Sequence, residues 1–164
     1  MKKAIEYIKK IINNESPTTG IILGSGLNNI TTSINNKIVI PYKDIPSFQT
    51  TSVEGHPGEL IIGNINQSNH LVAFANGRFH LYEGLKYNET QILIDLFDNI
   101  GCQSVIITNS SGCLDASWEP GDLMIIDSHI DMTFRDSTVI HKRKRGNVYY
   151  NQYLLQIAKD EMKK

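Results

Sequence analysis

The spacing of apolar residues predicts helices at three places in the chain. In residues 3–13 the apolar positions recur every three or four residues, which is the repeat of a helix with one buried face. Residues 87–100 have the same repeat, and Gly101 follows them as a C-terminal cap would. Residues 152–163 predict a more polar closing helix.

Short apolar runs between turn-forming residues predict strands. Such runs occupy residues 20–23, 59–65, 70–75, 104–108 and 123–126, and a shorter apolar segment at residues 38–40 ends at Pro41. The second and third runs are joined by a polar turn at residues 66–69, so they are expected to pair with each other. Because strands alternate with helices, the pattern predicts an α/β fold with a largely parallel sheet covered on both faces. Residues 1–164 suffice for a single domain with its own core.

The composition is that of an ordinary globular protein. Hydrophobic residues make up 40% and charged residues 20%, and the formal net charge of -1 gives no general attraction to nucleic acid or to an anionic membrane. The apolar runs are too short to cross a bilayer, and the N-terminal residues lack the apolar core of a secretory signal. Cys102 and Cys113 favour reduced thiols in a cytoplasmic protein, and they make a weak case for a metal site.

A basic run at residues 141–145 is the one segment that could suggest nucleic acid binding. No repeated aromatic residues accompany it, so we interpret it as a solvated loop or an edge that faces another subunit. Nucleic acid binding would show as a strongly salt-dependent affinity.

Residues suited to anion binding follow the apolar run at residues 71–75. Arg78 offers a planar fork of donors that suits a phosphate or a carboxylate. His80 can donate a hydrogen bond or a proton, and Glu83 is close enough in sequence to orient its ring. This cluster is expected at the end of a buried strand, where open α/β sheets bind their ligands.

Three other segments have small polar residues in a similar setting. Ser25 lies in a Gly-Ser-Gly turn directly after the run at residues 20–23, and its flanking glycines let backbone N–H groups approach an anion closely. His56 lies in a turn made rigid by glycine and proline, and the run at residues 104–108 ends in Asn-Ser-Ser-Gly. Each signal is weak alone. Because carboxyl ends of parallel strands share one edge, we expect Ser25, His56, Arg78 and the Ser110 amide to converge on one oxyanion.

Together these segments resemble the trimeric purine nucleoside phosphorylases. The matching segments come in the family's order and at its approximate spacing: residues 20–27, 52–58, 77–84, 108–112 and 120–124. The string Gly-Arg-Phe-His-Leu-Tyr-Glu-Gly at residues 77–84 is highly specific, and the resemblance extends to about residue 129. It implies a three-layer nucleoside phosphorylase-like fold, with a mixed, largely parallel central sheet flanked by helices.

The resemblance also implies a reaction, the reversible phosphorolysis of purine ribo- and deoxyribonucleosides in purine salvage. The products would be the free base and the sugar 1-phosphate. Inorganic phosphate would be a co-substrate, and neither a cofactor nor a metal would be needed. The protein would be a homotrimer in the cytoplasm, without a nucleic acid or membrane partner.

Site residues are carried over from the family by position. The phosphate ligands would be Ser25, His56, Arg78 and the backbone of Ser110. The groups around the ribose and the purine would be His80, Tyr82, Asn109, Ser111 and Gly112. His80 would hydrogen-bond the side of the ribose 5′-hydroxyl, and Tyr82 would lie against the sugar. Arg78, His80 and Glu83 would be the catalytic residues.

The chain departs from the family pattern in three places. Ser110 and Ser111 stand where the family usually has two alanines, and the match thins after residue 129. The sequence ends at Lys164, whereas the family continues for roughly its last third, which carries residues that hold the purine. We therefore expect an N-terminal portion of such an enzyme, incomplete at its C-terminus and weakly active or inactive alone.

Two alternative functions remain open at this stage. A nucleosidase would use water in place of phosphate, and the proposed oxyanion ligands argue against it because water needs no such clamp. A non-catalytic protein that binds phosphate or nucleoside would show binding without turnover.

Overall fold

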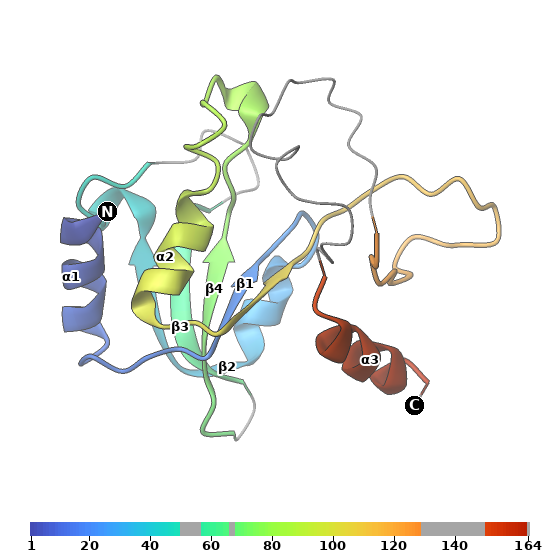
Figure 1. Cartoon of the computed structure of the whole chain (residues 1–164), viewed down its shortest axis with the longest axis horizontal. Helices are drawn as coiled ribbons and strands as arrows, with labels where there is room; N and C mark the ends of the chain where they lie inside the picture. The colour runs from blue at the N-terminus through green and yellow to red at the C-terminus, as the bar shows by residue number, and fades with distance from the viewer. Residues whose placement is uncertain (50–56, 66–67, 129–149, 164) are drawn as a thin grey trace. The chain divides into compact units, whose positions relative to one another are not determined.

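The computed structural model describes residues 1–49, 57–65, 68–128 and 150–163 (Figure 1). These residues divide into two compact units, Met1–Gly112 and Cys113–Lys164. The first unit contains the sheet and the candidate site. The second unit contains helix α3 (Gln152–Glu161). Within the described part of the chain, none of the helices has the length and apolar character needed to cross a membrane.

In the described part of the chain, five strands form a single mixed sheet in the order β2-β3-β4-β1-β5. Their bounds are β1 (Thr19–Ile22), β2 (Ile34–Pro41), β3 (Glu59–Ile65), β4 (Leu71–Asn76) and β5 (Ser104–Ile107). Strand β1 pairs in parallel with β4 on one side and with β5 on the other. The pairings of β2 with β3 and of β3 with β4 are antiparallel, as expected for the two runs joined by residues 66–69. The sheet therefore combines a parallel half with an antiparallel half.

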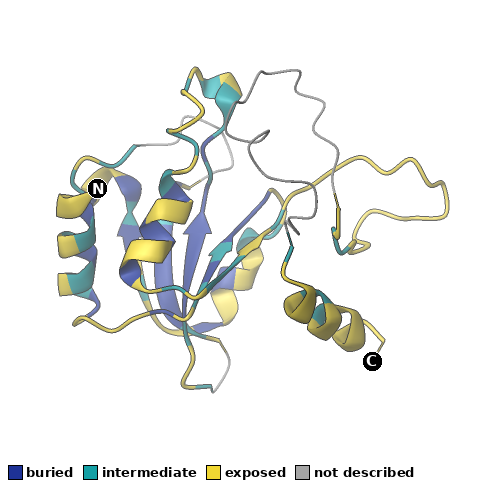
Figure 2. Cartoon of the chain, viewed as in Figure 1, coloured by how far each residue is buried: buried dark blue, intermediate teal, exposed yellow. Residues whose placement is uncertain are grey.

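Helices α1 (Lys2–Ile11) and α2 (Ile92–Ile100) pack on the same face of this sheet (Figure 1). The core beneath them includes side chains from both helices and from alternate positions of the strands, such as Ile8, Leu60, Ile62 and Phe97. Strands β3 and β4 are buried along most of their length (Figure 2). The opposite face has a smaller apolar cluster centred on Phe74.

Among the described residues of the first unit, three short 3₁₀ helices lie in the connections between the strands and helices. They are η1 (Asn28–Ser33), η2 (Tyr42–Asp44) and η3 (Leu81–Glu83). The last two bring Tyr42 and Glu83 close to the residues that follow β4.

The second helix is shorter than the apolar pattern predicts, because it begins at Ile92 rather than at residue 87. Two local hydrogen bonds hold the preceding residues in turns: the Lys86 N–H donates to the Glu89 carboxylate at 2.6 Å, and the Thr90 hydroxyl donates to the Tyr87 carbonyl at 2.8 Å. Such bonds compete with the helical pattern. Gly101 ends the helix as expected, with a φ of 111°.

The strand expected at residues 123–126 does not form. Leu123 and Met124 are exposed, and no strand among the described residues pairs with them. An apolar run becomes a strand only where a neighbouring strand satisfies its backbone, and the local pattern does not show whether one is present.

The packing of Gly20 against α2 makes a testable prediction about stability. A Cβ atom at Gly20 would lie 2.9 Å or less from three ring atoms of the buried Phe97. We expect Gly20→Ala to lower the free energy of unfolding by about 1–3 kcal/mol, measured by urea denaturation. Gly112→Ala is the control, because no atom lies within 4 Å of its added methyl group. Equal stability of the two variants would contradict this packing.

Candidate active site

The carboxyl ends of β1, β4 and β5 meet at one edge of the sheet. Because all three run in parallel, Ile22 at the end of β1 lies opposite Ala75 in β4 and opposite Ile107 in β5. The segments that follow these strands begin at Leu23, Gly77 and Thr108. This is the arrangement in which an open α/β sheet binds ligands at its strand ends.

Thr108 joins the segments after β1 and β5. Its hydroxyl accepts a hydrogen bond from the Gly24 N–H at 2.8 Å and donates one to the Ile22 carbonyl at 3.0 Å. Gly24 is required here, since a Cβ atom would lie 2.7 Å from the Asn109 Cα and 2.8 Å from the Thr108 carbonyl oxygen. The two strand ends therefore approach each other at backbone distance.

A second bond joins the same segments further out. The Ser110 hydroxyl donates to the Ser25 carbonyl at 2.7 Å, so the Ser110 side chain holds the turn after β1. Gly26, which follows Ser25 in this turn, has a φ of 86°, a conformation that favours glycine. Within the residues that the structure describes, the backbone N–H groups of Ser25, Gly26 and Ser110 have no hydrogen-bond acceptor.

The Arg78 guanidinium reaches from the end of β4 to the end of β5. Its Nη1 donates to the Thr108 carbonyl at 3.0 Å, and its Nε donates to His80 Nε2 at 3.0 Å. A guanidinium carries five N–H donors. Among the described residues these two bonds are the only ones that Arg78 makes, so the remaining donors are available to a ligand.

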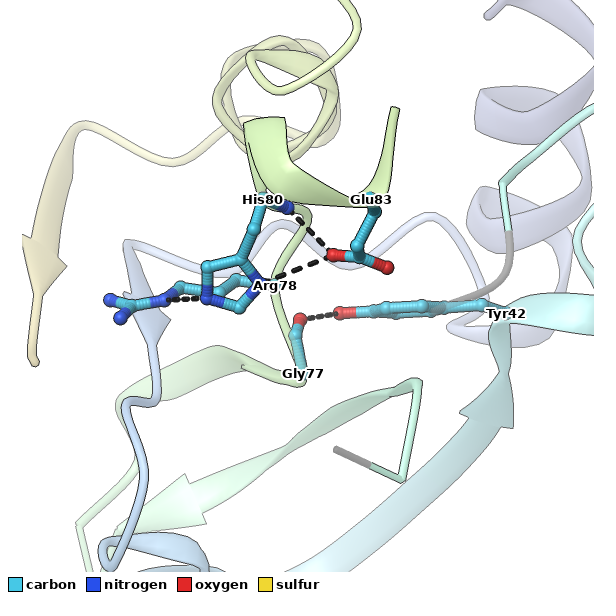
Figure 3. Close-up of polar contacts among 5 residues, drawn as sticks. All are labelled: Tyr42, Gly77, Arg78, His80 and Glu83. Atoms are coloured by element: carbon cyan, nitrogen blue, oxygen red, sulfur yellow. Dashed lines mark hydrogen bonds and ion pairs between the residues drawn. The ribbon is translucent and has the colours of Figure 1, made fainter. Parts of the chain in front are cut away.

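His80 links Arg78 to Glu83 (Figure 3). Because His80 Nε2 accepts from Arg78, the ring proton lies on Nδ1, which donates to Glu83 Oε1 at 3.1 Å. The same carboxylate oxygen accepts the His80 backbone N–H at 2.8 Å. The Glu83 side chain is only 6% exposed. These bonds fix both the orientation and the tautomer of the imidazole, and with them the direction of the guanidinium.

Tyr82 lies on the outer side of this cluster. Its ring stacks on the His80 imidazole, with centroids 4.6 Å apart and an interplanar angle of 19°. Tyr82 is 73% exposed. An exposed aromatic ring held in this way offers an apolar face to a ligand.

The structure brings together most of the site residues that the sequence predicts. Arg78, Ser25 and Ser110 are joined through Thr108 and Gly24, and His80, Tyr82 and Glu83 adjoin Arg78. Three others follow β5 in exposed positions: Asn109, Ser111 and Gly112. Among the residues with a described placement, the Asn109 side chain bonds only the neighbouring Ser110 carbonyl, at 3.4 Å. His56 and the basic run at residues 141–145 lie outside the described residues.

Sequence reasoning missed the role of Thr108. Its β-branched side chain ends an apolar run, which is typical of an ordinary strand residue. No pattern indicates that its hydroxyl would bridge to β1, 86 residues away from Ile22 in sequence. Among the described residues, no cluster of three or more His, Cys, Asp or Glu side chains could hold a metal ion.

The Thr108 bridge can be tested by changing only its hydroxyl. Thr108→Val leaves the Gly24 N–H without its acceptor and removes one of the two hydrogen bonds to the Ile22 carbonyl, which still accepts the backbone N–H of residue 108, so we expect the free energy of unfolding to fall by about 1–3 kcal/mol in urea denaturation. Thr108→Ser keeps the hydroxyl and should retain most of this stability. A valine variant that is as stable as the wild type would contradict this role of the hydroxyl.

Comparison with known proteins places the chain in a family. A sequence model described as phosphorylase superfamily matches residues 18–164. The chain belongs to the phosphorylase superfamily. Within the superfamily it is similar to purine nucleoside phosphorylase 1 of Geobacillus stearothermophilus, with 36% identity over 97% of this chain and 61% of that protein.

Solved structures of superfamily members agree with this assignment. The fold is similar to that of Schistosoma mansoni purine nucleoside phosphorylase in complex with inosine, with a TM-score of 0.64 and 37% identity over 74% of this chain and 41% of that one. A purine nucleoside phosphorylase in complex with ribose 1-phosphate matches with a TM-score of 0.65 and 37% identity, over 74% of this chain and 43% of that one. The chain thus spans less than two thirds of the length of these relatives.

Proposed function

We propose that the chain functions as a purine nucleoside phosphorylase, which cleaves purine nucleosides with inorganic phosphate. The observation that carries this proposal is a set of donors at the strand ends without an acceptor among the described residues: the remaining N–H groups of the Arg78 guanidinium and the backbone N–H groups of Ser25, Gly26 and Ser110. A phosphate dianion needs several donors that converge from different directions. The similarity to named purine nucleoside phosphorylases supports the choice of substrate class.

The phosphate would lie between Arg78 and the turns that follow β1 and β5. Arg78 would supply a positive charge and paired donors. Ser25 would supply its backbone N–H and its hydroxyl, and Ser110 would supply its backbone N–H. His56 belongs to the same proposal by family resemblance. His80 Nε2 lies 3.0 Å from Arg78 Nε, so its ring would adjoin a phosphate held by Arg78, and the sugar would lie beside that ring.

The sugar and the purine would lie beyond the phosphate. The exposed ring of Tyr82 would contact the ribose, and His80 would hydrogen-bond the side of its 5′-hydroxyl; the stacking of the two rings supports this proposal. The residues after β5 would line the remaining ribose and purine region: Asn109, Ser111 and Gly112. A ribose 1-phosphate complex of a structural neighbour is consistent with a sugar and a phosphate bound side by side.

The chemistry follows from charge. A phosphate oxygen forms a bond to the anomeric carbon as the glycosidic bond to the purine nitrogen breaks, and the purine takes the electron pair of the broken bond together with a proton. The sugar becomes cation-like on the way, so an adjacent phosphate dianion stabilises it. Arg78 holds that dianion in position, and its own orientation is fixed by His80, Glu83 and Thr108. A cytoplasmic homotrimer that needs no cofactor completes the proposal.

The deciding experiment measures whether inosine cleavage requires phosphate. The purified chain is incubated with radiolabelled inosine, with and without phosphate. In parallel, the chain is fused to the portion of the Geobacillus stearothermophilus relative that it does not match. We expect ribose 1-phosphate only when phosphate is present, with weak or no turnover by the chain alone and more by the fusion. Free ribose formed without phosphate would indicate a nucleosidase, and a fusion that is inactive on every purine nucleoside would overturn the proposal.

A further inference from the structure

A buried tyrosine outside the candidate site contacts the backbone that carries Arg78 (Figure 3). Tyr42, the first residue of η2, is only 1% exposed, and its hydroxyl donates to the Gly77 carbonyl at 2.8 Å. A carbonyl can only accept, so the phenol must be the donor. Gly77 immediately precedes Arg78 and has a φ of 126°, a conformation that favours glycine.

We propose that Tyr42 is a positioning residue for the phosphate site, which it serves by fixing the peptide that precedes Arg78. This inference rests on the proposed function, since it assigns Tyr42 a role in the affinity for phosphate. Tyr42 is not a catalytic residue, because its hydroxyl is buried against Gly77 and points to the backbone rather than to a substrate.

The Tyr42 ring holds the other side of Arg78 as well. It packs against Phe79 with centroids 5.7 Å apart, and both rings contact Phe48, at 5.1 Å from Tyr42 and 6.0 Å from Phe79. One side chain thus contacts both sequence neighbours of Arg78, through its hydroxyl on one side and its ring on the other. The backbone of Arg78 has little freedom to shift between them.

Tyr42 is itself anchored to the end of β4. Its backbone N–H donates to the Gly58 carbonyl at 2.8 Å, and the Gly58 N–H donates to the Asn76 carbonyl at 3.0 Å. Burial, with a smaller contribution from the Glu59 carboxylate, raises the pKa of the Tyr42 phenol far above its ordinary value. The phenol therefore stays protonated and remains a donor at neutral pH.

This anchoring matters because the Arg78 side chain makes two directed bonds, one to His80 and one to Thr108. A shift of its backbone by about 1 Å would misdirect the donors that remain for phosphate, and such a misplacement can cost about 100-fold in a catalytic rate. The Tyr42 hydroxyl removes that freedom without occupying any part of the site.

The test compares Tyr42→Phe with a control that disturbs the same aromatic cluster. Tyr42→Phe keeps the ring and removes only the bond to Gly77, whereas Phe48→Leu loosens the ring packing and leaves that bond in place. Binding of inorganic phosphate is measured by calorimetry, and solvent exchange of the Arg78 Nε–H by NMR. We expect about tenfold weaker phosphate binding and faster Nε–H exchange in Tyr42→Phe, and a change of less than about threefold in either value in Phe48→Leu.

The outcomes separate this inference from the proposed function. If the wild-type chain binds phosphate and Tyr42→Phe binds it equally well, the inference is overturned and the proposed function stands. If the wild-type chain binds no phosphate, activity of the fusion still decides the proposed function, and the exchange rate of the Arg78 Nε–H alone decides whether Tyr42 positions Arg78. Should Tyr42→Phe not fold, a phosphate titration of the unchanged chain replaces it. The Gly77 carbonyl carbon should then shift together with the Arg78 Nε–H, and a stationary carbonyl resonance would contradict the inference.

Discussion

Replacing Arg78 with alanine should weaken phosphate binding by about 10²–10³-fold. The substitution removes a permanent cation and the two or more charge-assisted hydrogen bonds that its free donors can make, each worth about 1.5–3 kcal/mol. It also removes the bond from Nη1 to the Thr108 carbonyl, which joins the ends of β4 and β5. The phosphate concentration needed for half-maximal inosine cleavage should rise by a similar factor, so both calorimetry and kinetics can measure the change.

Two further variants make this test specific to the position and geometry of Arg78. Arg78→Lys keeps the charge but loses the planar fork, so its affinity for phosphate should lie between those of the wild type and Arg78→Ala. Lys37→Ala removes the same charge from an exposed position in β2. If Arg78→Ala lost no more affinity than Lys37→Ala, Arg78 would not be a phosphate ligand.

Replacing Glu83 with alanine should also weaken phosphate binding, by about tenfold or more, although Glu83 itself would repel the anion. The Glu83 carboxylate accepts both the ring Nδ1–H and the backbone N–H of His80. Without it, the imidazole can rotate or change tautomer, and Arg78 Nε loses the acceptor that orients the guanidinium. Loss of a nearby negative charge alone would instead strengthen phosphate binding, so the sign of the change distinguishes the two effects.

Glu83→Gln is the matched control for this prediction. Glutamine keeps the shape of the side chain and a carbonyl oxygen that can accept the same two bonds. We expect its affinity for phosphate to stay within about threefold of the wild type. An NMR measurement of the His80 ring nitrogens should show the Nδ1–H tautomer in the wild type and Glu83→Gln, and a mixture in Glu83→Ala. Unchanged or stronger phosphate binding in Glu83→Ala would contradict the orienting role.

Much of the sheet could be predicted because its strands are short, apolar and bounded by turn residues. The strands from Leu71–Asn76 and Ser104–Ile107 were identifiable in this way. The run at residues 123–126 has the same local signature and is not a strand, because strand formation depends on a neighbour that the run itself does not specify. The start of α2 was missed because the hydrogen bonds of Glu89 and Thr90 outweigh a weak helical repeat.

The site shows a similar division between what a sequence pattern can and cannot reveal. The convergence of Ser25, Arg78 and Ser110 was predictable, since it follows from parallel strands that end at one edge. The supporting contacts were not predictable: Thr108 bridges to β1, and Tyr42 bonds Gly77, 35 residues away in sequence. These contacts depend on the three-dimensional packing, and the presence of a threonine or a tyrosine in the sequence does not indicate them. The assignment of His80 to the ribose stays a prediction. The structure shows a separate contact of this residue, the hydrogen bond that His80 Nε2 accepts from Arg78 Nε.

The central claim is that the strand ends of the first unit form a phosphate site, and a titration with inorganic phosphate followed by NMR tests it most directly. We expect the Arg78 Nε–H and the backbone N–H groups of Ser25, Gly26 and Ser110 to shift together and to saturate with one dissociation constant. Chloride at equal ionic strength should leave them unchanged. Resonances that stay still at saturating phosphate, or that move only in residues 113–163, would contradict the claim.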